Sequence, residues 1–277
     1  MEGGPREAWW VGKLQAPKRQ TRESASPLLQ SPAPSSTGAH PIRRLILAAL
    51  LAFGAGLTLA CADTLPLPAG LIALDSSEGE HLLFTAKETK AYFPLSIHFV
   101  TQVNPAFCGP PSISMVLNAL GVPRPPSPLT VGLGMFDQDN VFTPKTDAIK
   151  MKADVERGGM TLDQLGGILA AHDLKVEVHH AADSSVDAFR QAATTELAGA
   201  DRFVLVNYLR SAIGQQTGGH ISPLAAYDAA TDRFLILDVS RYKYPPVWAK
   251  TADLFAAMNT PDSAANNLSR GYVIVGR

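Results

Sequence analysis

Cysteine is scarce in this sequence. Its 277 residues include only two cysteines, Cys61 and Cys108. So few cysteines cannot build the disulfide framework of a small secreted domain. No Cys/His cluster has the ligand spacing of a zinc site, which disfavours a metal centre. Lysine and arginine do not cluster either, which argues against nucleic acid as a partner. Internal repeats are also missing, so a single non-repetitive fold is expected.

The first 62 residues are expected to lie outside the fold. Residues 1–40 are rich in Pro, Ser and Arg and lack apolar periodicity, which predicts a disordered extension. Residues 41–62 combine Arg43-Arg44, a short apolar run and a small-residue end at Ala60-Cys61-Ala62. This order is typical of a signal peptide, because the apolar run is too short to span a bilayer comfortably.

We therefore predict cleavage after Ala62 and export to the periplasm, without stable membrane association after cleavage. An uncleaved membrane anchor is an alternative. A lipoprotein anchor at Cys61 is less favoured, because Thr58 stands where a lipobox usually has a large aliphatic residue.

Residues 63–277 are long enough for one domain with a sizeable core. The whole chain has 24 Lys and Arg and 25 Asp and Glu, and its first 62 residues hold seven of the former and three of the latter. The predicted mature domain therefore has a net charge of about −5. After cleavage Cys108 is its only cysteine, and a lone thiol in an exported protein calls for an explanation.

Hydrophobic periodicity predicts helices in the first half of the domain and strands in the second. The residues from Tyr92 to Thr101 are expected to be extended or irregular. Helices are predicted from Ser76 or Ser77 to Thr85, from Gly109 to Leu120, from Thr161 to His172, over 186–197 and over 252–258. Strands are predicted over 176–179, 203–209, 220–227, 234–240 and 272–275. This order indicates an α+β domain in which a helical part packs on an antiparallel sheet.

Cys108 directly precedes one of these helices. The free N–H groups and dipole of a helix start favour a thiolate. Gln102, six residues upstream, offers a side-chain donor for an oxyanion. These two residues suggest a cysteine nucleophile, although a cysteine at a helix start is often a small buried hydrophobic residue.

Two downstream residues complete a catalytic pattern. His220 begins a predicted strand just after Gly218-Gly219, where small residues leave room for a substrate backbone. Asp238 ends the next predicted strand, and adjacent antiparallel strands would bring it to the His220 imidazole. Nucleophile, base and orienting acid are the parts of a Cys-His-Asp triad. His220 would hold the Cys108 thiolate as an ion pair and lower the thiol pKa. Each residue alone also has a structural explanation, and the joint pattern favours catalysis.

Four stretches resemble phytochelatin synthases, a papain-like family that acts on glutathione. They are FVTQVNPAFCG (99–109), SMVLNALG (114–121), GGHISPLAAY (218–227) and FLILDVSRYKYPPVW (234–248). The resemblance implies a papain-like cysteine protease fold and places the family's catalytic triad on Cys108, His220 and Asp238. It also implies that Gln102 and the Cys108 backbone N–H form the oxyanion site.

The resemblance further implies that the thiolate attacks the Cys–Gly amide of glutathione and releases glycine. The γ-glutamylcysteinyl group then passes to water, giving γ-glutamylcysteine, or to a second glutathione, giving phytochelatin. No cofactor is required, although Cd²⁺ or Zn²⁺ can enter as glutathione thiolate complexes in heavy-metal detoxification. The γ-glutamyl end of glutathione needs polar partners near the motif strands, and a homodimer is left open. The candidates for substrate binding are Asn207, Arg210, Gly219, Arg241 and Tyr242.

Two features depart from the pattern. Pro110 and Pro111 remove N–H donors from the helix start, which would raise the thiol pKa. The sequence ends near Arg277 without the Cys-rich C-terminal extension of the plant enzymes, so it resembles the short bacterial members. Two alternatives remain: another exported cysteine peptidase such as a leader-peptide processing enzyme, and a catalytically silent papain-fold module that binds thiols or metals.

Overall fold

The computed structural model describes residues 64–127, 131, 133–199 and 201–277. The segment from Cys61 to Arg277 forms one compact unit. The predicted disordered extension, the predicted signal peptide and its cleavage site lie outside the described residues. Within the described ranges, none of the helices has the length and apolar character needed to cross a membrane.

Seven strands form one sheet, in which every pair of neighbours is antiparallel. The order across the sheet is β1-β6-β5-β4-β3-β7-β2. The strands are β1 (Ile72–Ala73), β2 (Lys175–His180), β3 (Arg202–Leu209), β4 (Gly219–Asp228), β5 (Arg233–Ile236), β6 (Val247–Lys250) and β7 (Gly271–Gly276). β4 is the middle strand, and nine of its ten residues are buried. Because β4 is paired on both sides, the backbone that carries His220 at its start is held in a fixed position.

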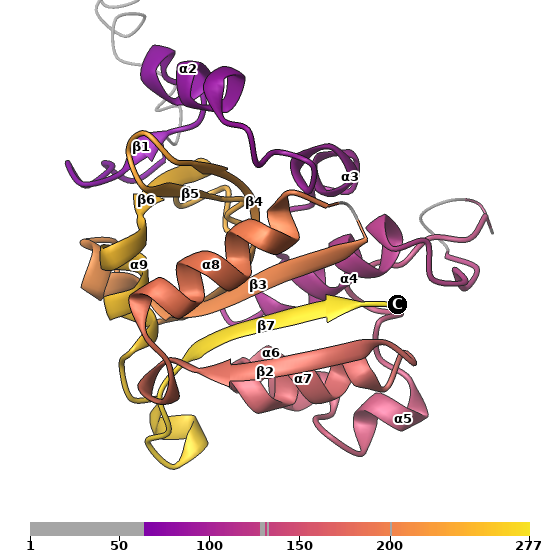
Figure 1. Cartoon of the computed structure of the whole chain (residues 1–277). Coiled ribbons are helices and arrows are strands. Elements are labelled where there is room, and N and C mark those ends of the chain that lie inside the picture. The colour runs from indigo at the N-terminus through magenta and orange to yellow at the C-terminus, as the bar shows by residue number, and fades with distance from the viewer. Residues whose placement is uncertain (1–63, 128–130, 132, 200) are drawn as a thin grey trace, which may run out of the picture. The chain divides into compact units, whose positions relative to one another are not determined.

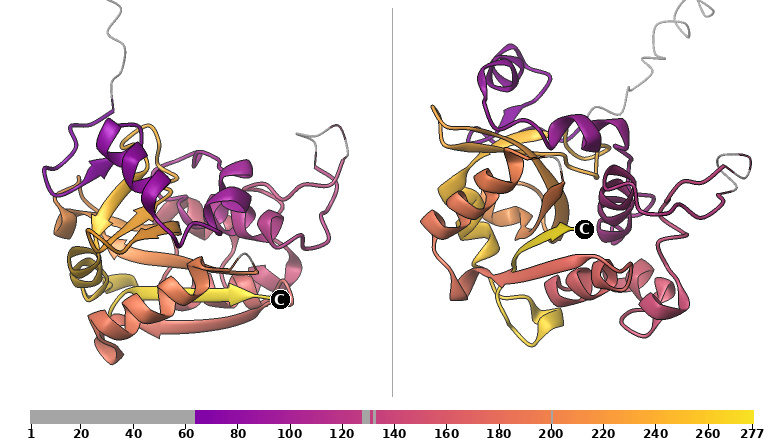
Figure 2. Two further views of the ribbon diagram at one scale, coloured as in Figure 1. Left: turned by 45° about the horizontal axis from the view of Figure 1, so that its top comes forward. Right: turned by 45° about the vertical axis from the view of Figure 1, so that its right-hand side comes forward.

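Helices lie against both faces of this sheet. They are α2 (Ser77–Thr85), α3 (Tyr92–Ile97), α4 (Gly109–Ala119), α5 (Pro144–Asp147), α6 (Lys152–Gly158), α7 (Leu162–Ala170), α8 (Val186–Leu197) and α9 (Thr251–Met258), with 3-10 turns η2 (Ala181–Asp183), η3 (Arg210–Ile213) and η4 (Ser263–Ala265). Figure 1 shows α8 in front of β3 and α4 behind it. Figure 2 shows the helix-rich first half, indigo to pink, beside the orange and yellow strands of the second half. The α+β class is confirmed.

The predicted helix starts are confirmed by their caps. The Ser76 hydroxyl accepts from the Gly79 N–H at 3.0 Å, which begins α2. Thr161 and Gln164 form a capping box at the start of α7. Such caps satisfy the N–H groups that a first turn leaves without intrahelical partners.

Two predictions of local structure are wrong. The segment expected to be irregular contains α3, and its Pro94 falls in the first turn, where proline is tolerated. The strand predicted over 234–240 ends at Ile236, so Asp238 lies two residues beyond β5. β6 follows and pairs with the far side of β5, with Trp248 opposite Leu235.

α4 is buried on all sides. Every residue from Gly109 to Asn118 is buried, including Ser112 and Ser114. An all-round buried helix belongs to the core rather than the surface. α4 packs against β4, α3 and α7, so its N-terminal residue, Cys108, has a fixed position beside the central strand.

Candidate active site

Cys108 is the N-cap residue of α4 and is 7% exposed. The Ser112 hydroxyl, one turn further on, lies 2.9 Å from the carbonyl oxygen of Cys108 and 3.2 Å from that of Ile221. This contact fastens the first turn of α4 to the start of β4. The nucleophile candidate and the His220 segment are therefore held together.

His220 and Asp238 are in direct contact. Nε2 of His220 lies 2.9 Å from Oδ1 of Asp238 and 2.8 Å from the Ser222 hydroxyl. An ionised carboxylate only accepts hydrogen bonds, so Nε2 carries the proton and Nδ1 is left as the basic nitrogen. The edge of the Tyr208 ring packs on the imidazole, with centroids 5.6 Å apart. The base candidate is thus oriented from two sides.

Asp238 is fully buried and has two further partners. Oδ1 accepts from Nη2 of Arg210 at 2.8 Å and from the Ser240 N–H at 2.8 Å. Arg210 itself is only 2% exposed, and its guanidinium stacks on the Tyr244 ring at 5.4 Å. The arginine therefore compensates the buried carboxylate, which would otherwise be strongly unfavourable.

Burial dominates the electrostatics of the Cys108 thiol. It raises the pKa of the thiol and outweighs the hydrogen bond from Ile221 and the charge of Arg210, which lower it. Burial also lowers the pKa of His220, although Asp238 opposes this effect. In Asp238, burial alone would raise the pKa, but His220 and Arg210 outweigh it and hold the pKa below its usual range.

At neutral pH these directions favour a neutral thiol, a neutral imidazole and a carboxylate in the free protein. The predicted lowering of the Cys108 pKa is wrong for the free protein, because the thiol is more deeply buried than the sequence indicated.

Cys108 and His220 line the same small cavity, of about 140 Å³. Asn207 and Gly219, two of the predicted substrate-binding residues, line it as well. A Cβ added at Gly219 would lie 3.3 Å from Nε of Arg270, so the arginine side chain would have to move by a few tenths of an ångström. The other lining residues are Pro105, Ala106, Gly158, Gly159, Met160, Ile221, Asp262, Ala264 and Arg270.

Arg270 and Asp262 give this cavity a pair of opposite charges. Nη2 of Arg270 lies 3.4 Å from Oδ1 of Asp262, and both side chains are mostly buried. Nη1 of Arg270 donates to the Pro261 carbonyl at 2.5 Å, which anchors the guanidinium. Nε is buried and has no hydrogen-bond partner within the described part of the chain. A buried donor without a partner is costly, which points to a ligand group at this position.

Gln102 contacts the segment that follows Asp238. Its backbone N–H donates to the Val239 carbonyl at 2.9 Å, so it is held next to Asp238. Its side chain is buried, and Nε2 donates to the Asn104 carbonyl at 2.7 Å and to the Tyr242 hydroxyl at 3.0 Å. Gln102 is not among the lining residues of the small cavity. Its role as an oxyanion donor stays a prediction.

The remaining predicted substrate-binding residues contact the protein itself. Arg210 pairs with Asp238, as described above. Nε of Arg241 donates to the Thr101 hydroxyl at 2.6 Å, and its guanidinium lies 4.8 Å from the centre of the Phe99 ring. The Tyr242 hydroxyl accepts from Gln102. None of these three residues lines the small cavity, and their roles in binding stay predictions.

The sequence of residues 62–272 matches the family model described as phytochelatin synthase. The chain belongs to the phytochelatin synthase family. It is 34% identical to glutathione gamma-glutamylcysteinyltransferase 1 of Lotus japonicus, over 73% of this chain and 40% of that relative. It is 30% identical to the Schizosaccharomyces pombe glutathione gamma-glutamylcysteinyltransferase, over 76% and 50%, respectively.

Glutathione gamma-glutamylcysteinyltransferase 1 of Arabidopsis thaliana is also 30% identical, over 77% of this chain and 43% of the relative. The chain thus spans half or less of the length of these curated relatives.

Arg270 and Asp262 were not among the site residues predicted from the sequence. Arg270 precedes the last strand and falls outside every motif considered above. It reaches the cavity because β7 pairs with β3, which places Gly271 opposite Asn207. That long-range pairing was the only available signal, and it is not visible in local sequence.

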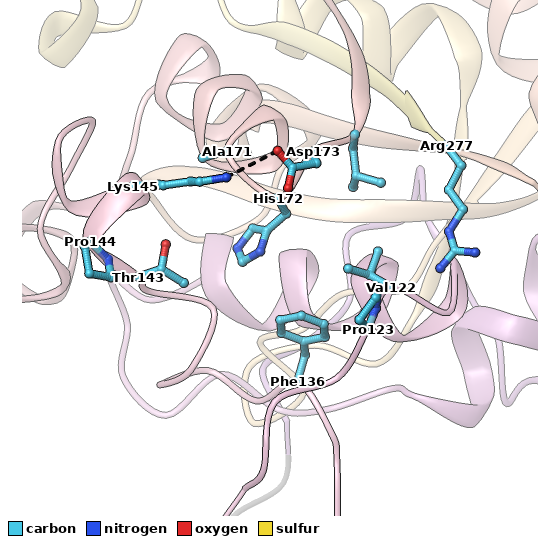
Figure 3. Close-up of a pocket in the computed structure, with 11 residues that line it drawn as sticks. Val122, Pro123, Phe136, Thr143, Pro144, Lys145, Ala171, His172, Asp173 and Arg277 are labelled. Carbon is cyan, nitrogen blue, oxygen red and sulfur yellow. Dashed lines mark hydrogen bonds and ion pairs between the residues drawn. The ribbon is translucent and has the colours of Figure 1, made fainter.

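A larger cavity, of about 850 Å³, lies elsewhere, between the residues around α5 and the end of α7 (Figure 3). Its polar groups bind one another or the backbone: Lys145 pairs with Asp173 at 3.3 Å, and Nε2 of His172 contacts the Val141 carbonyl at 2.9 Å. The Arg277 guanidinium donates to the Gly121 carbonyl. The residues of the predicted triad are absent from its lining, so the smaller cavity is the candidate active site.

Proposed function

We propose that this chain cleaves the Cys–Gly amide of glutathione through a thioester on Cys108. The observation that carries the proposal is that Cys108 and His220 share one small cavity, with His220 bound to buried Asp238 at 2.9 Å. Family membership supports the choice of substrate. A papain-like fold, with the triad Cys108, His220 and Asp238, is part of the same proposal.

In the first step, Nδ1 of His220 takes the thiol proton as the Cys108 sulfur attacks the carbonyl carbon. Because both groups start neutral, charge separation develops only as the C–S bond forms. Asp238 then stabilises the imidazolium, with Arg210 keeping the carboxylate ionised. Gln102 Nε2 and the Cys108 N–H would stabilise the oxyanion. One such donor lowers the activation barrier by about 3–4 kcal/mol.

In the second step, the imidazolium gives its proton to the leaving glycine amine and the C–N bond breaks. The γ-glutamylcysteinyl group remains on sulfur as a thioester. Water or the amine of a second glutathione then attacks this thioester, and His220 takes a proton from the attacking group. The products are γ-glutamylcysteine in the first case and phytochelatin in the second.

The charge pair in the cavity suits the γ-glutamyl end of glutathione, which carries a free carboxylate and a free amine. Nε of Arg270 would donate to the carboxylate, and Asp262 would accept from the amine. Charged hydrogen bonds to buried partners are among the stronger ones in proteins. An anchored γ-glutamyl end would place the Cys–Gly amide at Cys108.

We also propose that acceptor glutathione can arrive as its Cd²⁺ or Zn²⁺ thiolate complex, and that the protein acts after export to the periplasm. Within the described residues, no group of three or more His, Cys, Asp or Glu side chains is placed to hold a metal ion. In this proposal the metal therefore travels with the substrate.

The test is glycine release from glutathione by the purified chain and by Cys108→Ala. We expect the variant to lose all turnover, because alanine leaves no thiol beside His220 to form the thioester. Cys61→Ala, which removes the only other cysteine, is the matched control and should keep full activity. Mass spectrometry should find one γ-glutamylcysteinyl group on the unmodified chain and none on Cys108→Ala.

Glycine release that survives in Cys108→Ala would contradict the proposal. An unmodified chain that cleaves a Gly-Gly leader peptide and leaves glutathione intact would favour a leader-peptide processing enzyme instead. The product mixture, measured with and without Cd²⁺, separates hydrolysis from transfer to a second glutathione.

A further inference from the structure

Tyr242 is hydrogen-bonded to the glutamine that would stabilise the oxyanion. Nε2 of Gln102 donates to the Asn104 carbonyl at 2.7 Å and to the Tyr242 hydroxyl at 3.0 Å. An amide nitrogen carries two protons, so both have acceptors in the free protein. The amide cannot be turned the other way, because its oxygen would then meet the Asn104 carbonyl oxygen at 2.7 Å.

The turn that carries Tyr242 is fixed at its start and in its middle. The Ser240 N–H donates to Asp238 at 2.8 Å, which ties the start of the turn to the proposed acid. Nε of Arg241 donates to the Thr101 hydroxyl at 2.6 Å, which ties its middle to the residue just before Gln102. The hydroxyl of Tyr242 is therefore held at a defined position beside the Gln102 amide.

The two acceptors of the Gln102 amide differ in kind. Asn104 offers a backbone carbonyl, which can move only if the chain moves. Tyr242 offers a hydroxyl at the end of a side chain that is 45% exposed. The N–H of Gln102 that donates to Tyr242 is therefore the one that can donate to an oxyanion instead, while the loop stays in place.

We propose that Tyr242 is a positioning residue for Gln102, an inference that rests on the acyl-transfer function proposed above. In the free protein its hydroxyl accepts the second Nε2 proton and fixes the direction of that N–H, while the Asn104 carbonyl prevents a flip of the amide. When the tetrahedral intermediate forms, this hydrogen bond moves from the Tyr242 oxygen to the oxyanion. No covalent bond of Tyr242 or Gln102 changes, and Tyr242 is not a catalytic residue.

The test combines Tyr242→Phe with Gln102→Ala in a double-mutant cycle on glycine release. We expect Tyr242→Phe to lower kcat about 3- to 10-fold and to leave KM within about twofold, because without this acceptor the second Nε2–H of Gln102 is less often aligned with the oxyanion. In the Gln102→Ala background the same substitution should leave kcat unchanged, because Tyr242 acts through the amide. Tyr92→Phe, which removes a tyrosine hydroxyl on α3, is the matched control.

Three outcomes would overturn the proposal: an unchanged kcat in Tyr242→Phe, an equal loss of kcat in both backgrounds, or a loss confined to KM. The side chain is half-exposed, so the variant should fold, and its circular dichroism and melting temperature verify this. Absence of glycine release by the unmodified chain would overturn the proposed function, and the role of Tyr242 with it. Release by the unmodified chain with an unaffected Tyr242→Phe overturns the role of Tyr242 alone.

Discussion

Two cavities of this protein differ in a way that separates size from chemistry. The larger has about 850 Å³ and apolar walls, with polar groups that already bind one another or the backbone. The smaller has about 140 Å³ and contains a thiol, an imidazole and a buried arginine nitrogen that has no hydrogen-bond partner among the described residues. A large apolar pocket is the usual first candidate for a ligand site. Here the smaller cavity is the better candidate, because reactive groups converge in it.

Burial explains why the charged side chains of these two cavities differ in how strongly they can interact with a ligand. Lys145 and Asp173, at the larger cavity, form their ion pair with side chains that are 68% and 86% exposed. Such exposed pairs are screened by water and contribute little. Arg270 and Asp262, at the smaller cavity, are 9% and 14% exposed, so they can act strongly on a ligand that enters.

Removal of the buried cation, Arg270, should have the largest effect. Arg270→Gln should lower kcat/KM for glutathione about 10- to 100-fold, because a charged hydrogen bond contributes about 1.5–3 kcal/mol. Most of the loss should appear in KM, since the γ-glutamyl carboxylate lies far from the bond that breaks. Steady-state kinetics of glycine release measures both parameters.

Lys145→Gln is the matched control for Arg270→Gln, because it removes a cation from the larger cavity. We expect its kcat/KM to stay within about twofold of the unmodified chain. Equal losses in the two variants would mean that the larger cavity also contacts glutathione. The comparison between the cavities would then fail.

Much of the fold, and the contact between His220 and Asp238, could be predicted because their signals are local. The helix start at Thr161 and the hydrophobic periodicity of the segment that forms α4 are short-range patterns. The approach of Asp238 to His220 also follows from one antiparallel pairing, that of β4 with β5. Such features depend on residues close in sequence or on adjacent strands.

The rest depends on contacts between distant parts of the chain. Arg270 reaches the cavity only because β7 pairs with β3. Arg210 is held by the buried carboxylate of Asp238, 28 residues away. Its position in the sequence, close to the motif strands, had suggested a role in substrate binding instead. The pKa of Cys108 depends on its burial, which a helix start in the sequence does not reveal.

The pH dependence of alkylation sharpens this last point. Burial raises the pKa of the Cys108 thiol, and the thiolate is the form that reacts with iodoacetamide. The alkylation rate of the unmodified chain should therefore rise about tenfold per pH unit and keep rising above pH 8.5, the ordinary pKa of a cysteine. The labelling reaction is quenched at successive times, and mass spectrometry of the labelled Cys108 fraction gives the rate at each pH.

A thiolate–imidazolium pair in the free protein would behave differently. Its alkylation rate would be high and nearly constant from pH 5 to 8, because the thiolate would already be formed. That result would restore the lowered pKa expected from the sequence and contradict the neutral resting state. Cys61→Ala removes any labelling of the other cysteine and is the form to measure.

The smallest effect is expected in the larger cavity. His172→Phe keeps a flat ring against Phe136 (Figure 3). It removes the hydrogen bond between Nε2 and the Val141 carbonyl. The free energy of unfolding should fall by about 1 kcal/mol, the usual contribution of one such bond, as measured by urea denaturation. Glycine release should stay within about twofold, because none of the groups proposed to act on glutathione lines that cavity. A loss of activity without a loss of stability would instead couple the two cavities, and size would then matter as well as chemistry.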